Sequence, residues 1–394
     1  MRSIGQRFSF ATVLASTMGA ATFSLVVYSV LAAELIEEFG VDRWQIGALV
    51  TANSLFGAIV SPFVGVFTDR IGARRATILT LIVSAVALSG TALSPVYPLL
   101  IVVALVGGVA QALTNPATNK LISLHIDAGR RGVITGIKQS GVQFGTFLAG
   151  VILPPVAIAY GWRAAVGVFV AMAVSAVVLA MVTLPADPHH DEARHGPSTP
   201  GPLPGLIYRL AVYGFLLGSA GTAIFTYLPL FAEEQLGFPA EVAGLSVSVT
   251  GLVGIVARIS WGRIAEQRFG SARSLALIAV LAVTAALTLA GAGRVPAAVW
   301  IGAVLTGASA SSWNTVGMLA IIQNVPASRA GRGSGIVLLG FLAGLATGAP
   351  LFGWSVDVLG TYTPGWLVVG GVFAAAVGVI WPLVPRRRAG RATV

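Results

Sequence analysis

Two basic residues stand inside long apolar stretches of the sequence. Lys138 lies in "GVITGIKQSGVQFG" (residues 132–145), and Arg258 lies in "GIVARISWGRIAEQ" (residues 254–267). A cation in apolar surroundings normally has a partner or faces a polar cavity. The planar guanidinium group of arginine can bond both oxygens of a carboxylate, whereas a lysine ammonium is a compact charge that can release its proton. The two residues therefore indicate a site for an anion.

The elements that must position these residues are apolar helices. Of the 394 residues, 56% are hydrophobic and only 10% are charged, against roughly 25% charged residues in soluble proteins. We therefore predict an all-α membrane protein with twelve spans, each able to cross about 30 Å of hydrocarbon. The first span is too long to be a signal peptide, so we expect it to remain in the mature protein. The predicted spans are 8–33, 44–68, 76–94, 98–122, 132–157, 163–184, 206–232, 240–264, 273–292, 297–323, 333–357 and 364–384.

The distribution of arginine predicts the orientation in the membrane. With the N-terminus inside, the outer loops contain only Arg43, Arg163 and Arg294, and the inner loops contain most of the other arginines. This positive-inside pattern predicts a multi-pass protein of a bacterial-type plasma membrane, with both termini in the cytoplasm. The net charge of +10 is then explained by the arginines that fix the orientation of the chain in the membrane. Because the basic groups lie in short loops, we expect no nucleic-acid partner.

The chain has a linker in its middle and similar halves on either side. Residues 185–205, "PADPHHDEARHGPSTPGPLPG", are polar and rich in proline and glycine, as expected of a cytoplasmic linker. Gly65 and Gly262 lie 197 residues apart, and other pairs of like residues lie 199 apart. We therefore predict two pseudo-symmetric six-helix bundles, 1–184 and 206–394. This duplication is typical of transporters that work by alternating access.

The loop between the second and third predicted spans resembles the signature loop of the major facilitator superfamily. "GVFTDRIGARR" (residues 65–75) has the expected glycines, the Asp-Arg pair and the final basic pair, and the second half has a degraded copy, "GRIAEQRFG". The resemblance implies the twelve-helix fold of that superfamily and a conformational latch at the cytoplasmic face. Glycines allow close helix approach, and an aspartate there can meet a helix N-terminus. The residues of this latch would be Gly65, Asp69, Arg70, Gly72, Arg74, Arg75 and Glu266.

Two features separate the chain from the proton-driven drug exporters of that superfamily. Such exporters usually carry an arginine in the fourth span and a Gly-Pro motif in the fifth, and neither is present in the corresponding predicted span. None of the fourteen acidic residues lies deep in a predicted span. An embedded carboxylate would bind a cationic drug or the coupling proton. Its absence favours an anionic ligand for Lys138 and Arg258.

Several polar residues share the depth of the two cations. At 1.5 Å per residue, Lys138 and Arg258 lie roughly 9 Å to the cytoplasmic side of their helix centres. Asn115 and Asn314 lie roughly 6–7 Å to the same side. Gln139 directly follows Lys138. We predict that these five residues contribute to a substrate site.

Two tyrosines complete the set of candidate substrate-binding residues. Tyr28 and Tyr227 occupy matching places near the outer ends of the first and seventh predicted spans. Tyrosine is common at both membrane–water interfaces, so the simpler interpretation is an interfacial aromatic belt. The alternative is an outer gate that closes over the substrate.

The other candidates also have purely structural interpretations. Lys138 could extend to the inner interface, and Arg258 could brace the inner end of its span. Asn115 precedes Pro116, so its side chain could satisfy backbone groups that the proline leaves unpaired. The sequence leaves these alternatives open.

The segment around Arg258 narrows the resemblance within the superfamily. "VARISWG" is similar to the eighth-span segment of monocarboxylate porters and of oxalate/formate exchangers, where the arginine holds the substrate carboxylate. Two departures leave the subfamily open. The aspartate of the monocarboxylate porters one turn earlier is replaced by Gly254, and their lysine in the first span is missing. Lys138 would supply the second charge, as in cyanate-type porters.

The sequence thus predicts a secondary active transporter that moves a small anion, most simply a monocarboxylate, across the plasma membrane by alternating access. Protons are a candidate coupling ion, and anion exchange is the alternative. A proton-coupled exporter of hydrophobic drugs is the closest rival within transport. A membrane sensor or receptor that transports nothing is the rival from another class. We expect a monomer in the lipid bilayer without cofactor, metal or enzymatic activity.

Overall fold

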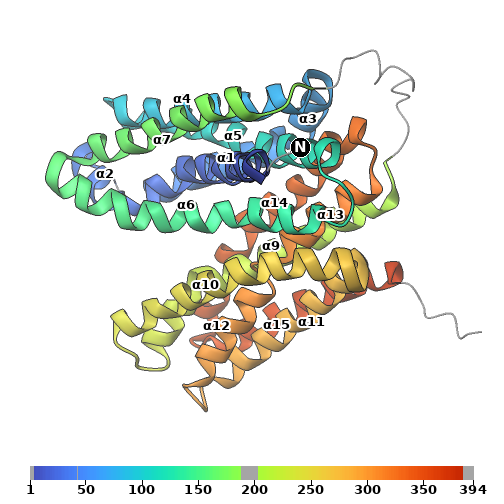
Figure 1. Ribbon diagram of the computed structural model, residues 1–394. Helices are drawn as coiled ribbons and strands as arrows, with labels where there is room; N and C mark the ends of the chain where they lie inside the picture. Colours follow the sequence, from blue (N-terminus) through green and yellow to red (C-terminus); the bar gives the residue numbers. More distant parts are fainter. Residues whose placement is uncertain (1–3, 42, 188–202, 385–394) are drawn as a thin grey trace, which may run out of the picture.

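The computed structural model describes residues 4–41, 43–187 and 203–384, and in these ranges the chain forms helices and no strand (Figure 1). The helices of the first half are α1 (Ile4–Val30), α2 (Ala32–Phe39), α3 (Arg43–Ile71), α4 (Ala73–Leu93), α5 (Tyr97–His125), α6 (Arg131–Tyr160) and α7 (Trp162–Thr183). Those of the second half are α9 (Gly205–Glu234), α10 (Ala240–Ile264), α11 (Gly270–Gly291), α12 (Ala298–Ala308), α13 (Trp313–Asn324), α14 (Ala330–Leu359) and α15 (Thr363–Ile380). The short helices η1 (Ala265–Phe269), η2 (Ala327–Arg329) and η3 (Trp381–Leu383) complete the fold.

Helices are found at the positions of all twelve predicted spans. Ten stretches of the described chain are long and apolar enough to cross a membrane. One of them, Leu245–Gly291, contains two predicted spans, because the π-helix η1 joins α10 to α11 without a loop. The tenth predicted span is divided into α12 and α13, which have 11 and 12 residues. The predicted all-α membrane fold is confirmed.

Besides η1, two local features differ from the sequence prediction. The first is α2, a short helix after α1 that buries Leu35, exposes Glu37 and ends at Gly40, whose φ of 59° is left-handed. The second is the break between α12 and α13 at residues 309–312, which are Ser-Ala-Ser-Ser. Serine side chains that bond nearby carbonyls compete with the helical hydrogen bonds. Here Ser309 Oγ donates to Leu305 O and Ser312 Oγ donates to Gly307 O.

The buried hydrophobic residues form two large clusters. One contains residues of α1 to α7 together with Ile322 of α13, and the other contains residues of α9 to α15. Each half of the chain thus has its own hydrophobic core, as expected of two bundles. The predicted limits of the bundles, 1–184 and 206–394, stay a prediction. Most of the predicted linker, residues 188–202, lies outside the described residues.

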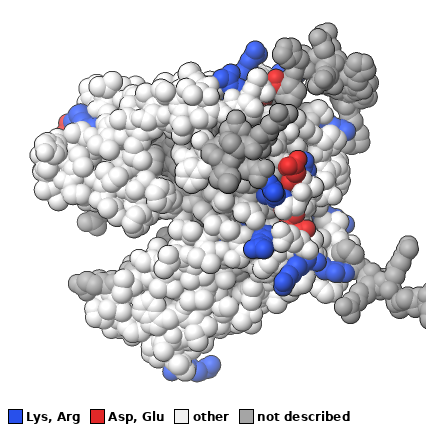
Figure 2. All heavy atoms as spheres, viewed as in Figure 1, with Lys and Arg blue, Asp and Glu red and all other residues white. Residues whose placement is uncertain are grey.

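The two halves meet at one end and diverge at the other (Figure 1). We call the end where α7 finishes and α9 begins the linker end, and the opposite end the open end. Helix α3 packs against α14, and α6 packs against α10. Figure 2 shows a hollow between the two lobes that widens toward the open end and is closed toward the linker end. On the face in this view, most of the charged side chains gather at the linker end.

Candidate functional site

Lys138 of α6 is fully buried and hydrogen-bonded to α5. Its Nζ atom donates to Asn115 Oδ1 at 3.0 Å and to Asn119 Oδ1 at 2.6 Å. Its exposed fraction is 0%, so the side chain does not extend to a membrane interface. These bonds use two of the three N–H donors of the ammonium group. The third has no hydrogen-bond partner among the described residues.

Asn115 and Gln139, two of the predicted substrate-site residues, belong to this cluster. Asn115 Oδ1 accepts a second hydrogen bond, from Gln139 Nε2 at 3.0 Å. The Asn115 carbonyl oxygen of the side chain is therefore committed to Lys138 and Gln139. The alternative was that Asn115 satisfies the backbone carbonyl that Pro116 leaves unpaired. That carbonyl needs a donor, and no hydrogen bond from Asn115 Nδ2 to the backbone is found in the described part of the chain.

The sequence analysis missed Asn119, a residue with 0% exposure that lies one helical turn after Asn115. Its Nδ2 atom donates to Ser334 Oγ of α14 at 2.9 Å and lies 3.1 Å from Met318 Sδ of α13. Asn119 therefore connects Lys138 to the other half of the chain. A signal was present, because residues i and i+4 share one face of a helix and both are asparagines in "NPATNK".

Arg258 of α10 is 6% exposed and bonded to neutral groups from both halves. Its Nε and Nη2 atoms donate to the Ser311 carbonyl oxygen at 2.8 and 2.5 Å. Its Nη1 atom donates to the Gln139 carbonyl oxygen at 2.6 Å and to Gln143 Oε1. Four of the five N–H donors of the guanidinium group are thus used. The sequence could not predict these acceptors, since two of them are backbone carbonyls.

The break between α12 and α13 explains why Arg258 lies where it does. An interrupted helix leaves carbonyl groups without their helical partners, and buried carbonyls need a donor. Arg258 bonds the carbonyl of Ser311 within the break, and Trp261 Nε1 donates to the carbonyl oxygen of Ala308 at 2.7 Å. The Arg-x-x-Trp spacing puts both donors on one face of α10. This face therefore also stabilises the broken span.

Glycines in α6 allow α10 to approach closely enough for these bonds. A Cβ atom on Gly136 would lie 2.7 Å from Ile259 Cα and 2.8 Å from the Arg258 carbonyl oxygen. Cβ atoms on Gly132 and Gly262 would overlap each other's backbone carbonyl groups. Larger residues would hold the helices apart. The glycine positions therefore place Arg258 beside Gln139.

The two buried cations have no acidic partner in the described part of the chain. The ion pairs found there are Lys120–Asp69 and Arg163–Glu38, and neither includes Lys138 or Arg258. Nor do the described residues contain a group of three His, Asp or Glu side chains that could hold a metal. A concentration of positive charge away from bulk water attracts anions strongly. The arrangement can therefore bind a small anion.

At the linker end, Asp69 of α3 caps the N-terminus of α14. Its two carboxylate oxygens accept hydrogen bonds from Gly331 N at 2.9 Å and Arg332 N at 2.8 Å, and α14 has no side-chain cap from its own N-cap residue. Lys120 Nζ lies 3.4 Å from Asp69 Oδ1 and donates to its carbonyl oxygen at 2.8 Å. A negative charge at a helix N-terminus is stabilising. Gly65 and Gly331 allow this approach, since a Cβ on either would overlap the other's carbonyl.

Glu266 makes the same kind of contact on the other side of the linker end. Its Oε1 atom accepts from Gly129 N at 2.9 Å and Arg131 N at 3.1 Å, and its Oε2 atom accepts from Gly132 N at 2.7 Å. These groups form the N-terminus of α6, which also lacks a side-chain cap of its own. A carboxylate from each half therefore caps a helix of the opposite half.

The remaining residues of the predicted latch do not cross between the halves. Gly72, with φ of 94°, starts α4, where Asp187 accepts hydrogen bonds from the backbone N–H groups of the first turn. Arg74 Nη2 donates to the Met181 carbonyl oxygen at 2.7 Å, within the same half. Arg70 and Arg75 are exposed. The loop motif thus divides into a cross-bundle part and a part that fixes the α3–α4 turn.

Three further candidates lie apart from the hydrogen-bonded cluster. Tyr28 is 1% exposed, and its hydroxyl oxygen lies 3.2 Å from Thr91 Oγ1, so it is not an interfacial belt residue. Tyr227 packs against Phe352 with ring centroids 5.1 Å apart. Both tyrosines lie toward the open end. Asn314 is half-buried one turn after Ser311, and its Oδ1 atom has no hydrogen-bond partner in the described structure.

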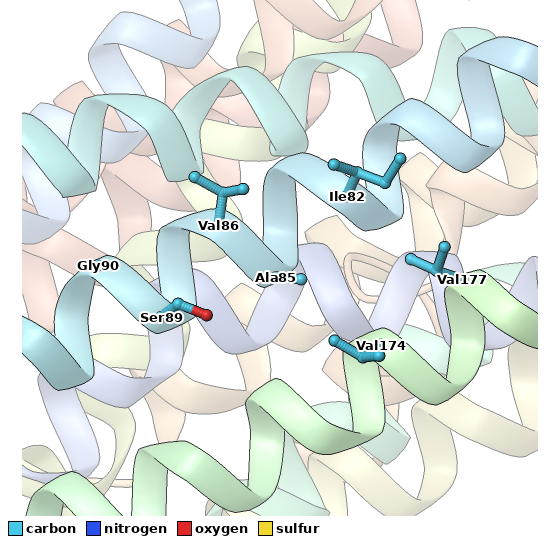
Figure 3. A pocket seen from close by; sticks show the side chains of 7 residues that line it. All are labelled: Ile82, Ala85, Val86, Ser89, Gly90, Val174 and Val177. Atoms are coloured by element: carbon cyan, nitrogen blue, oxygen red, sulfur yellow. The ribbon is translucent and has the colours of Figure 1, made fainter.

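An apolar groove on the outside of the first half is distinct from this site. It encloses about 470 Å³ between α4 and α7, and Figure 3 shows that its lining side chains come from these two helices. No charged residue lines it. The residues of the groove are Ile82, Ala85, Val86, Ser89, Gly90, Val174 and Val177.

Comparison with known proteins identifies the family. The family described as Major Facilitator Superfamily matches residues 10–301. The hexuronate transporter of Bacillus subtilis (strain 168) is 22% identical over 390 residues, which cover 90% of each chain. Monocarboxylate transporter 13 of Rattus norvegicus is 26% identical over 286 residues, 71% of this chain and 65% of that one. The crystal structure of the transporter FucP in the outward conformation has a TM-score of 0.75 at 18% identity and covers 96% of this chain and 100% of that one. Because the family match spans most of its length, this chain belongs to the Major Facilitator Superfamily, whose members are membrane transporters and not enzymes.

Proposed function

We propose that this transporter moves a small organic anion, most simply a monocarboxylate, by alternating access. The supporting observation is that Lys138 and Arg258 are both buried, lie in one hydrogen-bonded cluster and have only neutral acceptors among the described residues. Two cations without acidic partners are costly in an apolar interior, and an anion would lower that cost. The relatives named above include transporters of a hexuronate and of monocarboxylates, both of which are anions.

We also propose that the structure is the outward-facing state. The contacts at the linker end close one side, and the hollow in Figure 2 opens on the other. Arginines gather at the linker end, which fits a cytoplasmic location by the positive-inside rule. The likeness to FucP in its outward conformation agrees with this assignment. The protein would then lie in the plasma membrane with its open end outside.

An anion that enters the hollow would meet the two cations in different ways. Lys138, when charged, has one N–H donor left and can donate it directly to the anion. Arg258 also has one donor left, so a bidentate contact with a carboxylate requires one acceptor to leave. We propose that Gln143 leaves, because its side chain is only half-buried and its contact with Arg258 is not a backbone one. Gln143 would thus act as a placeholder for the substrate.

Proton coupling, if present, would use Lys138. The spans contain no acid at the level of the two cations, and an arginine stays protonated at any physiological pH. A lysine in a desolvated cavity can be neutral when the site is empty and can take up a proton with the anion. This would couple one proton to one anion without a carboxylate. Anion exchange would need no such step.

A ligand screen on the purified protein tests the proposal. A ligand that binds only the folded state raises the melting temperature. We expect acetate, L-lactate and glucuronate to stabilise the wild type, and Arg258→Ala to abolish the effect. D-xylose serves as the neutral ligand and ethidium as the hydrophobic cation. Stabilisation by ethidium alone would favour the drug-exporter alternative, and stabilisation by D-xylose alone would exclude an anion site.

Uptake into proteoliposomes separates a transporter from a sensor that only binds. We expect labelled L-lactate to enter vesicles that contain the wild type. Vesicles that contain Arg258→Ala should take up no more than empty ones. Binding of the anion without any uptake or exchange would contradict the proposed transport.

A further inference from the structure

Asn119 occupies the junction between the proposed anion site and the interface of the two halves. Its Oδ1 atom accepts the 2.6 Å hydrogen bond from Lys138, and its Nδ2 atom donates to Ser334 of α14. Asn119 and Ser334 are both 0% exposed. A buried amide with its donor and its acceptor committed to different partners has little rotational freedom.

The ammonium group of Lys138 decides which way this amide points. A charged lysine nitrogen can only donate, and a neutral one still has two N–H donors, which match Asn115 Oδ1 and Asn119 Oδ1. The oxygen of Asn119 therefore faces Lys138. The NH₂ group must then face Ser334 and Met318. Reversing the amide would put two donors against Lys138. The lysine on α6 therefore determines a hydrogen bond between α5 and α14.

The same part of α14 takes part in the linker-end contact. Ser334 follows three residues after Gly331, whose N–H group bonds Asp69. Lys120 follows Asn119 directly and bonds Asp69 from the α5 side. Two successive residues of α5 thus reach the anion site and the carboxylate cap. A change in the hydrogen bond between Asn119 and Ser334 therefore alters the position of α14 against α3 and α5.

We infer that Asn119 is a positioning residue that couples anion binding at Lys138 to the release of α14 at the linker end. The inference rests on the proposed function, in which Lys138 binds the anion. When the anion binds the ammonium group, its negative charge competes with Asn119 Oδ1 for Lys138. The 2.6 Å bond weakens, and the amide turns away from Ser334 more easily. The linker-end contact is then weaker in the loaded carrier than in the empty one. A ligand shifts a conformational equilibrium only through such a difference between states.

Distances between spin labels test the coupling. The chain contains no cysteine, so Val96→Cys and Val295→Cys introduce the sole labelling sites. Both positions are exposed, and each lies in an open-end loop of a different half. We expect 10 mM L-lactate to increase the short-distance population of the wild-type background in lipid nanodiscs. This shift reports closure of the open end.

Variants of the two partners decide the role of Asn119. We expect Asn119→Ala to bind L-lactate with a Kd within about threefold of the wild type. Lactate should change its ratio of short-distance to long-distance population about tenfold less than it changes the wild-type ratio, which is an ordinary size for a coupling between sites. Ser334→Ala removes one oxygen atom and should show the same loss. The double variant should be no worse than either single one, because both break one interaction.

A matched control separates this role from a general loss of packing. Ser84→Ala removes an equally buried hydroxyl that bonds only its own helix, and its response to lactate should equal the wild type. A wild-type response in Ser334→Ala and in any folded Asn119→Ala would overturn the inference. Absence of any lactate response in the wild-type background would overturn the proposed function as well.

Discussion

The α3–α14 and α6–α10 contacts are two versions of one arrangement. In each, a helix pair is held by glycines, and a carboxylate from one half, Asp69 or Glu266, caps a helix of the other half. The surroundings differ. Asp69 has Lys120 beside it, whereas the position 199 residues after Lys120 is Leu319. The α6–α10 contact instead contains Arg258.

This difference shows how a duplicated unit can divide its tasks. The backbone geometry of the two contacts is kept, because close helix approach depends on glycines and on helix N-termini. The carboxylate cap is kept as well, but the basic side chains are not. One contact has a lysine–aspartate pair at its linker end, and the other has an arginine bonded to neutral groups. We expect the first to affect mainly the conformational equilibrium and the second mainly binding.

Arg258→Lys should have the largest effect of the changes that test this division. A lysine cannot bond Ser311 and Gln139 and also offer a planar fork to a carboxylate, so we expect L-lactate uptake to fall on the order of 100-fold although the charge is kept. Uptake into proteoliposomes is the measurement. Arg263→Lys, an exposed change on the same helix, is the control. Uptake at the wild-type level in Arg258→Lys would refute its assignment as the anion clamp.

Asp69→Asn and Glu266→Gln compare the two caps directly. Asp69→Asn removes the negative charge beside Lys120, which keeps its bond to the backbone carbonyl oxygen of residue 69. We expect about 3 kcal/mol less stability for the closed linker end, near the lower limit for buried pairs. Glu266→Gln loses a charge at a helix N-terminus and one of two acceptor oxygens, together worth about 1–2 kcal/mol. Spin-label distances at the open end measure both shifts. Neither change should abolish lactate binding, and equal shifts would contradict the asymmetry between the contacts.

Lys138→Arg tests whether Lys138 carries the coupling proton or serves only as a fixed positive charge. We expect the variant to bind the anion but to lose accumulation driven by a pH gradient, because arginine does not release its proton. For one coupled proton and a gradient of one pH unit, the loss is about tenfold in accumulation. Lys138→Ala should lose affinity as well. If Lys138→Arg accumulates lactate under the gradient as the wild type does, the coupling idea is wrong.

Glu38→Gln should have the smallest effect on stability. It measures the contribution of an ion pair that lies outside the α3–α14 and α6–α10 contacts. Arg163 donates a 2.7 Å hydrogen bond to Glu38, and this bond lowers the pKa of the Glu38 carboxyl group. Any stabilisation is therefore present above the unfolded-state pKa and is lost as the pH falls through the lowered one. Both side chains are exposed, so we expect the melting temperature to change by no more than about 1 °C. A large fall at neutral pH would show that this ion pair supports the fold.

The sequence predicted the spans well and the local irregularities poorly. A long apolar run forms a membrane span whatever helices it packs against. The predicted limits therefore lie within a few residues of the helix ends. The break at 309–312 and the π-helix η1 were not predicted, because serine and polar residues are compatible with a continuous helix until a neighbour supplies other hydrogen bonds. In this protein Arg258 and Trp261 supply them for the break.

The sequence by itself determined that this protein spans a membrane as a duplicated bundle and that two cations lie in it without buried acids. The length of an apolar run and the types of its residues are properties of the sequence, and they do not depend on how the helices pack. Only the tertiary structure decided that Asn119 and Ser311 are the partners of Lys138 and Arg258, and that each carboxylate caps a helix of the opposite half. Those contacts join residues far apart in the chain, and several end on backbone atoms that every residue has. The positions of these contacts depend on how closely the helices approach each other at their glycines.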